Sequence, residues 1–114
     1  MPTVPYDEAI KQMVDDNPEM GTEMFEAAIN ALLAGDVDEG RIHLGSYVKS
    51  TLGFAELARR IDKDPKNLMR MLSPRGNPTA VNLFEIVSAC TASQGFTVTA
   101  QVTRPKSPAP SPAV

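Results

Sequence analysis

Cysteine and histidine are almost absent from this chain, since Cys90 and His43 stand alone among its 114 residues. A single cysteine cannot form an internal disulfide, so nothing points to an oxidising compartment. A single histidine excludes a metal site made of several histidines, and we expect His43 to be solvated or satisfied in the core and Cys90 to be buried and inert. No stretch approaches the roughly 18–20 apolar residues of a membrane span, and the first residues lack the basic-then-apolar pattern of a secretion signal. These absences predict a cytoplasmic protein that is not an enzyme and needs neither a cofactor nor a metal.

Charge is distributed unevenly along the chain, whose formal net charge is −3. Residues 1–52 hold ten acidic against three basic side chains, a balance of −7. Residues 53–78 hold six basic against three acidic side chains, a balance of +3. Local charge decides whether a surface attracts phosphates, so the middle of the chain is suited to nucleic acid. Charge alone does not establish this, because such a run is also typical of a solvated face.

Apolar residues recur at helical spacing over most of the chain. Residues of the kind that caps helix N-termini precede the periodic stretches, namely Asn17, Asp36, Asp64 and Thr79. Glycine follows several of these stretches, as is usual at helix C-termini. The pattern predicts about five helices, at roughly 17–34, 36–52, 54–61, 64–72 and 79–94, after a weaker amphipathic stretch at 6–14.

The periodicity changes after Gly95. Apolar and polar residues alternate from Phe96 to Thr103, which predicts a β-strand over 96–104. The run that follows, 105–114, is rich in proline, serine and alanine and predicts a disordered tail. We therefore expect an all-α fold with one C-terminal strand, divided into a partly helical segment at 1–21, a helical domain at 22–95, the strand at 96–104 and the tail at 105–114.

Two of the predicted helices, 54–61 and 64–72, have the spacing of a helix-turn-helix motif. Ala58 is the small residue that such a motif needs midway along its first helix, because the second helix crosses close over it. Apolar residues at suitable offsets can hold the pair together: Leu57, Ile61, Leu68 and Met71. The pair is typical of a DNA-binding motif, although a structural corner in a helical protein has the same outline.

Polar residues occupy the outward positions of the second helix of this pair. In a DNA-binding motif those positions face base edges in the major groove. Arginine and lysine can donate to guanine acceptors, and asparagine can make a bidentate pair with adenine. We therefore predict base reading by Lys66, Asn67, Arg70 and Ser73. Residues that flank the motif meet the DNA backbone, which predicts phosphate contacts for Arg59, Lys63 and Arg75.

These segments resemble the HigA-type addiction-module antidote proteins, which are helix-turn-helix antitoxins related to phage-repressor domains. The family's L-S-P-x-G-N-P loop, directly after the recognition helix, is present here as L-S-P-R-G-N-P at residues 72–78. The similarity extends over about 22–98 and includes A-A-I-N-A-L-L-A-G-D at 27–36. It implies a DNA-binding regulator that represses its own toxin–antitoxin operon. Two features depart from the family: Asp62 and Lys63 stand where glycine and an apolar residue are usual, and the C-terminal strand and tail are longer.

Two further partners are predicted besides double-stranded DNA. A lone strand leaves its backbone groups unpaired, so the strand at 96–104 is expected to pair with the same strand of a second copy in a two-fold dimer, or else to lie along its own helices as an extended arm. The acidic half, 1–52, is expected to face away from DNA and to bind a basic toxin, or simply to repel nucleic acid from that face. Alternative functions are a stand-alone or phage-borne helix-turn-helix regulator, and a protein-interaction module on the same scaffold without DNA binding.

Overall fold

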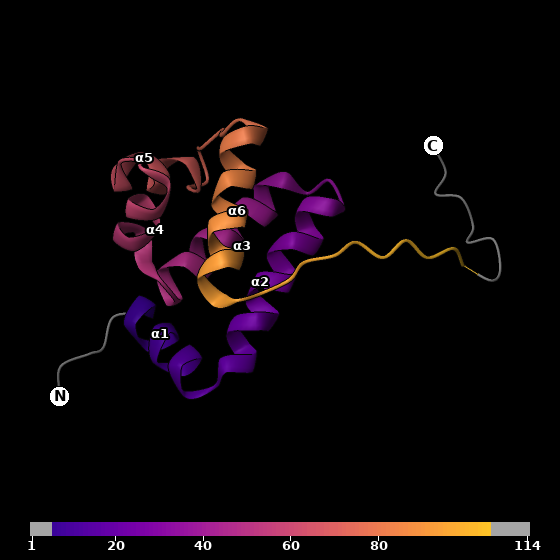
Figure 1. Ribbon diagram of the computed structural model, residues 1–114, viewed down its shortest axis with the longest axis horizontal. Helices are drawn as coiled ribbons and strands as arrows, with labels where there is room; N and C mark the ends of the chain where they lie inside the picture. The colour runs from indigo at the N-terminus through magenta and orange to yellow at the C-terminus, as the bar shows by residue number, and fades with distance from the viewer. Residues whose placement is uncertain (1–5, 106–114) are drawn as a thin grey trace.

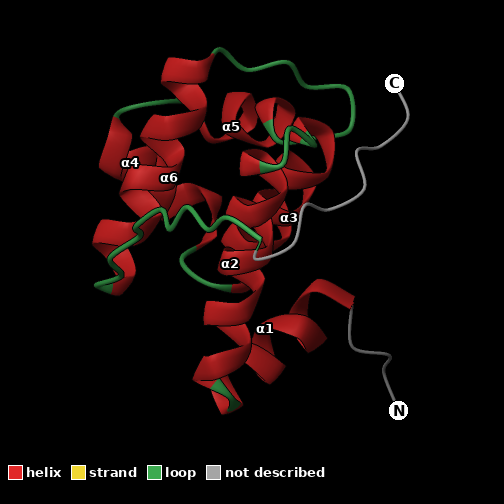
Figure 2. Ribbon diagram, turned by 90° about the vertical axis from the view of Figure 1, so that its right-hand side faces the viewer, coloured by secondary structure: helices red, strands yellow, loops and turns green. Residues whose placement is uncertain are grey.

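The computed structural model describes residues 6–105, which form six α-helices and no β-strand (Figure 2). Every helix predicted from the apolar spacing is present, and the weaker N-terminal stretch adds one more than the expected five. None of the helices in these residues combines the length and the apolar character that crossing a membrane requires. The helices are α1 (Tyr6–Asp16), α2 (Pro18–Leu33), α3 (Val37–Ser50), α4 (Gly53–Ile61), α5 (Pro65–Met71) and α6 (Ala80–Gln94).

Three helices begin at the side-chain caps expected from the sequence. The side chains of Asp36, Asp64 and Thr79 each accept a hydrogen bond from a backbone amide in the first turn of α3, α5 and α6. Such a bond satisfies one of the amides that a helix leaves unpaired at its start. Asn17 occupies the N-cap position of α2, but its side chain makes no cap bond; Pro18 stands in the first turn, a position that favours proline.

One hydrophobic core is formed by residues from all five helices from α2 through α6. The helix pair α2–α3 has the closest association, and Gly40 permits it, because a Cβ there would lie 2.7 Å from the Leu32 side chain. This close approach explains a glycine inside α3 despite its low helix propensity. The core's largest fully buried side chains are Tyr47, Leu44, Leu57, Leu68, Ile86, Val48 and Cys90.

Helix α1 packs on this body against α2 and α3. Its inward residue Val14 is buried, and the Lys11 ammonium donates a hydrogen bond to the Thr51 carbonyl oxygen at 3.0 Å. The pair α4–α5 lies on the opposite side of the view from the C-terminal segment (Figure 1).

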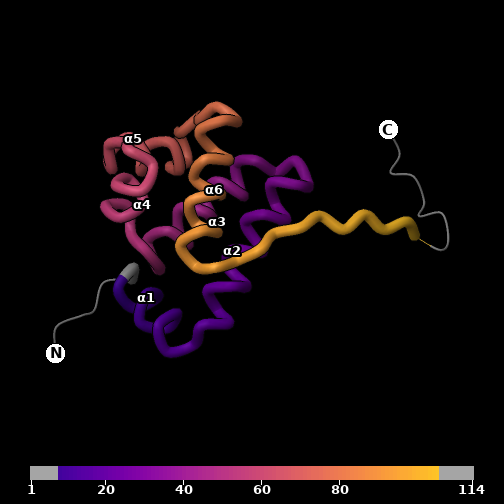
Figure 3. The backbone as a smooth tube through the Cα atoms, in the orientation of Figure 1, coloured from indigo at the N-terminus to yellow at the C-terminus, as the bar shows by residue number. Residues whose placement is uncertain are grey.

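The strand predicted at 96–104 is not formed in the single chain. Residues 96–105 instead leave the end of α6 as an extended arm, whose first part borders a hollow beside α2 and whose end projects beyond the helices (Figure 3). A strand needs a neighbour to complete its hydrogen-bond ladder, and no described segment lies beside the arm in that way. Only Phe96 turns inward, where its ring centroid lies 5.5 Å from that of Phe25. The predicted tail at 105–114 lies outside the described residues except for Pro105.

Candidate nucleic-acid interface

Helices α4 and α5 meet at a turn of three residues, Asp62 to Asp64. Asp62 adopts the left-handed conformation (φ 54°, ψ 54°), and the Lys63 amide then donates to the Ala58 carbonyl oxygen at 3.0 Å, which ends α4. Aspartate tolerates this conformation better than most residues other than glycine. Asp62 thus provides the turn geometry that glycine usually provides at this position. Ala58 is buried, as expected where a second helix packs closely.

Helix α5 buries one face and exposes the other. Leu68 and Leu72 lie in the core, whereas Lys66, Asn67 and Arg70 are exposed. At 100° per residue, the positions of Lys66 and Arg70 lie near the centre of the outward face, and Asn67 lies on one flank. The three polar residues expected to project from this helix therefore do so.

Arg70 and Asn67 are also joined to each other. The Arg70 Nη2 donates a hydrogen bond to the Asn67 Oδ1 at 2.7 Å. This bond orients the Asn67 amide so that its NH₂ group keeps both donors, and the carbonyl oxygen keeps a second lone pair. Arginine likewise retains most of its five donors, so the pair can present donors and acceptors together to a base edge.

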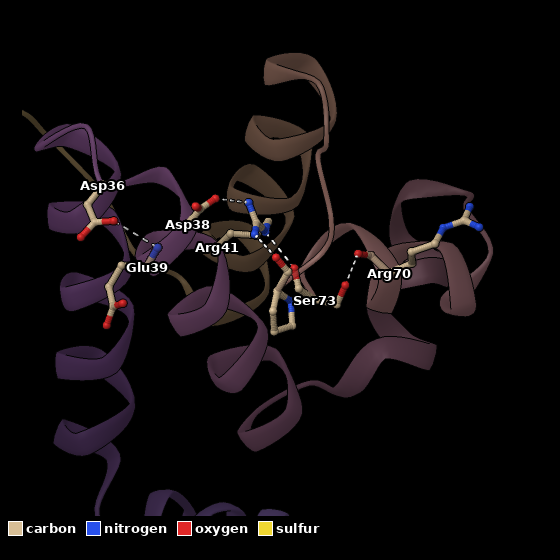
Figure 4. Close-up of polar contacts among 7 residues, drawn as sticks. Asp36, Asp38, Glu39, Arg41, Arg70 and Ser73 are labelled. Atoms are coloured by element: carbon tan, nitrogen blue, oxygen red, sulfur yellow. Dashed lines mark hydrogen bonds and ion pairs between the residues drawn. The ribbon is translucent and has the colours of Figure 1, made fainter.

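Ser73 is placed differently from the other predicted base-reading residues. Its hydroxyl donates to the Arg70 carbonyl oxygen at 2.7 Å and so satisfies one of the last carbonyls of α5. In Figure 4 this hydroxyl points back toward the helix, whereas the Arg70 side chain points away from it. The geometry gives Ser73 a role in ending α5, and base reading by Ser73 stays a prediction.

The residues predicted to contact phosphate differ in their own partners. Arg59 is exposed and forms an ion pair with Glu56, whose Oε2 lies 2.9 Å from the Arg59 Nε. This hydrogen bond lowers the pKa of Glu56 and raises the pKa of Arg59. Lys63 is half-buried, and its Nζ lies 3.5 Å from a Glu85 carboxylate oxygen on α6. Arg75 is exposed in the loop after α5.

Arg41 on α3 is the residue of this region that the sequence reasoning missed. It is only 3% exposed, and its guanidinium donates to the carbonyl oxygens of Ser73 and Pro74, both at 3.0 Å (Figure 4). A third bond, at 2.9 Å, joins it to the exposed Asp38 carboxylate. The guanidinium therefore fastens the loop after α5 to α3. A signal was available, because Arg41 stands on the inward-facing stripe of its helix, three residues before Leu44.

Backbone contacts also fix the conformation of the loop at 72–78. The Gly76 amide donates to the Ser73 carbonyl oxygen at 2.9 Å. A Cβ at position 76 would lie 2.2 Å from the Met71 carbonyl oxygen and 2.3 Å from that of Arg70, so only glycine fits. The L-S-P-R-G-N-P loop is thus a rigid closure of α5, fixed by Arg41 on one side and by the close approach at Gly76 on the other.

Cys90 and His43, the single cysteine and the single histidine, have the surroundings expected from the sequence. Cys90 is completely buried, as expected, and burial raises the pKa of its thiol to about 12. The thiol therefore stays protonated at neutral pH and is a poor nucleophile. The partly exposed His43 has its Nε2 3.0 Å from a Glu39 carboxylate oxygen one helical turn away.

Helix α5 is thus a short helix whose exposed face carries cationic and amide groups and whose other face is buried. Such a helix can donate hydrogen bonds to an anionic or acceptor-rich surface without rearranging its backbone. In comparisons with known proteins, no family model, no curated protein and no solved structure matches this chain.

Proposed function

We propose that this protein is a sequence-specific DNA-binding transcriptional regulator that acts as an antitoxin and represses its own toxin–antitoxin operon. The single observation that carries the DNA-binding part is the outward face of α5, where Lys66, Asn67 and Arg70 are exposed while Leu68 is buried beneath them. A helix anchored in this way enters the major groove as a rigid element. The antitoxin part is supported by the family resemblance of the loop at 72–78.

Contacts in this complex divide by position. Lys66 and Arg70 read guanine, and Asn67 reads adenine with its amide already oriented by Arg70. Arg75, exposed in the loop, and Arg59, which exchanges its bond to Glu56 for a phosphate, contribute affinity without sequence preference.

Binding to the DNA upstream of its own reading frame tests this function. Fluorescence anisotropy is measured with that duplex and with a shuffled duplex of equal length and composition, over a series of salt concentrations. Replacing Arg70 by alanine should weaken binding to the upstream duplex about 5- to 150-fold and reduce the preference for it over the shuffled one. Arg104→Ala is the matched control, because it removes the same charge from the exposed arm. Equal affinity of the wild type for the two duplexes, or an unchanged affinity of folded Arg70→Ala, would contradict the proposal.

A toxin partner for the acidic half requires a separate test. Glu23 and Glu26 on α2, together with Asp36 and Glu39 at the start of α3, are exposed and give a basic partner an electrostatic target. Co-expression with the product of the adjacent reading frame should yield a complex that charge reversal at these four positions weakens at low salt. The corresponding Asn and Gln variants should weaken it less. A complex that survives charge reversal unchanged at low salt places the docking site elsewhere.

One observation favours the alternative of a protein-interaction module. Met69 on α5 and Ile42 on α3 are exposed apolar side chains that line a hollow of about 230 Å³ together with Pro74. Exposed apolar groups beside a hollow are typical of sites that receive another side chain. Under this alternative, Met69→Glu abolishes binding to a protein partner, whereas Arg70→Ala leaves that binding intact and neither duplex binds.

A further inference from the structure

The arm at 97–105 is an extended segment whose backbone has no hydrogen-bonded partner among the described residues. Its backbone makes no hydrogen bond to any other described residue, and its side chains are exposed, Val102 at 95%. Natural edge strands are usually shielded by charges, proline or a bulge. Between Phe96 and Thr103 the arm has no charged residue, no proline and no glycine. The arm therefore keeps the backbone and side-chain pattern of a strand, while no segment within residues 6–105 pairs with it.

We propose that the arms of two copies of this chain pair as an antiparallel ribbon whose two-fold axis passes through Ala100. In this register Val98 of each copy lies opposite Val102 of the other, and Ala100 lies opposite itself. On the second face, Thr97 lies opposite Thr103 and Thr99 opposite Gln101. Apolar residues thus share one face, and threonines share the other, which are favourable cross-strand pairs.

A second copy of this chain fits the arm better than an unrelated partner because the pattern is complementary to itself. Pairing of two copies is destabilised wherever like charges lie directly opposite each other. The uncharged run from Phe96 to Thr103 avoids this entirely. A two-fold axis also satisfies both arms at once, as isologous contacts do.

The ribbon has support from the helical body, which it needs because an isolated two-stranded sheet is marginal in water. Each arm is anchored at its root by the Phe96 ring, 5.5 Å from that of Phe25. Beside the arm, a hollow of about 480 Å³ lies against α2, and the side chain of Leu33 at its border is 68% exposed. A second strand beside the arm would cover the exposed Leu33 side chain.

Cysteine cross-linking tests the register directly. The natural Cys90 is buried and should not react, so the wild type is the uncross-linked control. With diamide as the oxidant, Ala100→Cys should form a covalent dimer, because residue 100 lies opposite its own copy. Thr99→Cys and Gln101→Cys should each give little dimer alone, since their own copies lie on a diagonal at about 7–8 Å, but an equimolar mixture of the two should cross-link. Equal cross-linking of all three single variants would overturn the register, because it indicates random collisions of the arms.

Sedimentation of the 114-residue chain tests the assembly itself. The wild type should have twice the mass of the 12.3 kDa chain, and Val102→Glu should raise the dimer dissociation constant at least about tenfold, since the charge enters the ribbon twice. Val102 is 95% exposed, so the variant keeps its fold. Val81→Glu is the matched control, because Val81 is similarly exposed, at 74%, but lies on α6.

Two results would overturn the inference: a monomeric wild type, or a dimer that Val81→Glu disrupts and Val102→Glu does not. Neither result bears on the DNA-binding face of α5, because pairing of the arms does not depend on it. If both proposals hold, the operator should contain two inverted half-sites.

Discussion

Replacing Arg41 by methionine should destabilise the protein and loosen the closure of α5. Methionine preserves most of the apolar stem but removes the guanidinium that bonds the Ser73 and Pro74 carbonyl oxygens, both at 3.0 Å. Hydrogen bonds to charged groups contribute about 1.5–3 kcal/mol each. Ser73 keeps one partner, because the Gly76 amide also donates to its carbonyl oxygen.

The ion pair between Arg41 and Asp38 adds little to this effect. The Asp38 side chain is 84% exposed, so its carboxylate is hydrated once the arginine is gone. The net loss in the free energy of unfolding should therefore be about 2–3 kcal/mol, which corresponds to a fall of roughly 10–20 °C in Tm for a domain of this size. Arg41→Lys should lie between the variant and the wild type, because one ammonium can reach one carbonyl but cannot span two.

Thermal and urea unfolding, followed by circular dichroism at 222 nm, measure these differences. Arg60→Met is the matched control, because Arg60 is exposed and its ion pair is with Glu56 on its own helix, and it should change stability by less than about 0.5 kcal/mol. An Arg41→Met protein with the same Tm as Arg60→Met would refute the reasoning, since Arg41 would then contribute nothing beyond an exposed ion pair. At temperatures where it remains folded, Arg41→Met should also bind the upstream duplex more weakly than the wild type.

Three further predictions concern the same region and the core. Gly76→Ala should lower the free energy of unfolding by about 2–3 kcal/mol in urea titrations, because the new Cβ would collide with the Met71 carbonyl oxygen. Asp62→Gly should raise stability by roughly 0.5–1 kcal/mol by relieving the left-handed conformation, whereas Asp62→Val should lower it; equal stabilities would mean that the turn carries no strain. Burial raises the pKa of Cys90 and of Tyr47 to about 12, above their ordinary values of 9.0 and 10.0. The folded state therefore holds these protons more tightly than the unfolded state. The resulting stabilisation is complete below about pH 9 and is lost as the pH rises toward 12. The urea midpoint of unfolding should fall over this range, and it should fall less steeply in Cys90→Ala.

The parts of the structure that were predictable from the sequence are those that local chemistry decides. Asp64 begins α5 because its carboxylate accepts a bond from an amide two residues away, and the alternation of buried and exposed positions in α5 follows from helical periodicity alone. The same periodicity placed Lys66 and Arg70 on the outward face. Each of these features depends on residues within one or two helical turns, which a single sequence displays directly.

The missed features depend instead on contacts between distant parts of the chain. Arg41 bonds to Ser73, 32 residues further on, and Lys63 lies beside Glu85 on another helix. The roles of this lysine and this arginine become distinct only when the fold brings their partners close. An arginine inside an otherwise apolar stripe indicates that a partner exists, but not which carbonyl groups it will bond.

The arm was mispredicted for a different reason. Alternation from Phe96 to Thr103 indicates that this segment can form a strand with one apolar face and one polar face. Pairing also requires a second segment, which the alternation of one segment does not identify. All other regular elements in the described part of the chain are helices, which cannot supply a ladder, so the segment stays extended and unpaired. The absence of charge along it removes the usual obstacle to pairing with an identical strand. The segment that forms no strand in one chain thus has the pattern required to form a strand between two.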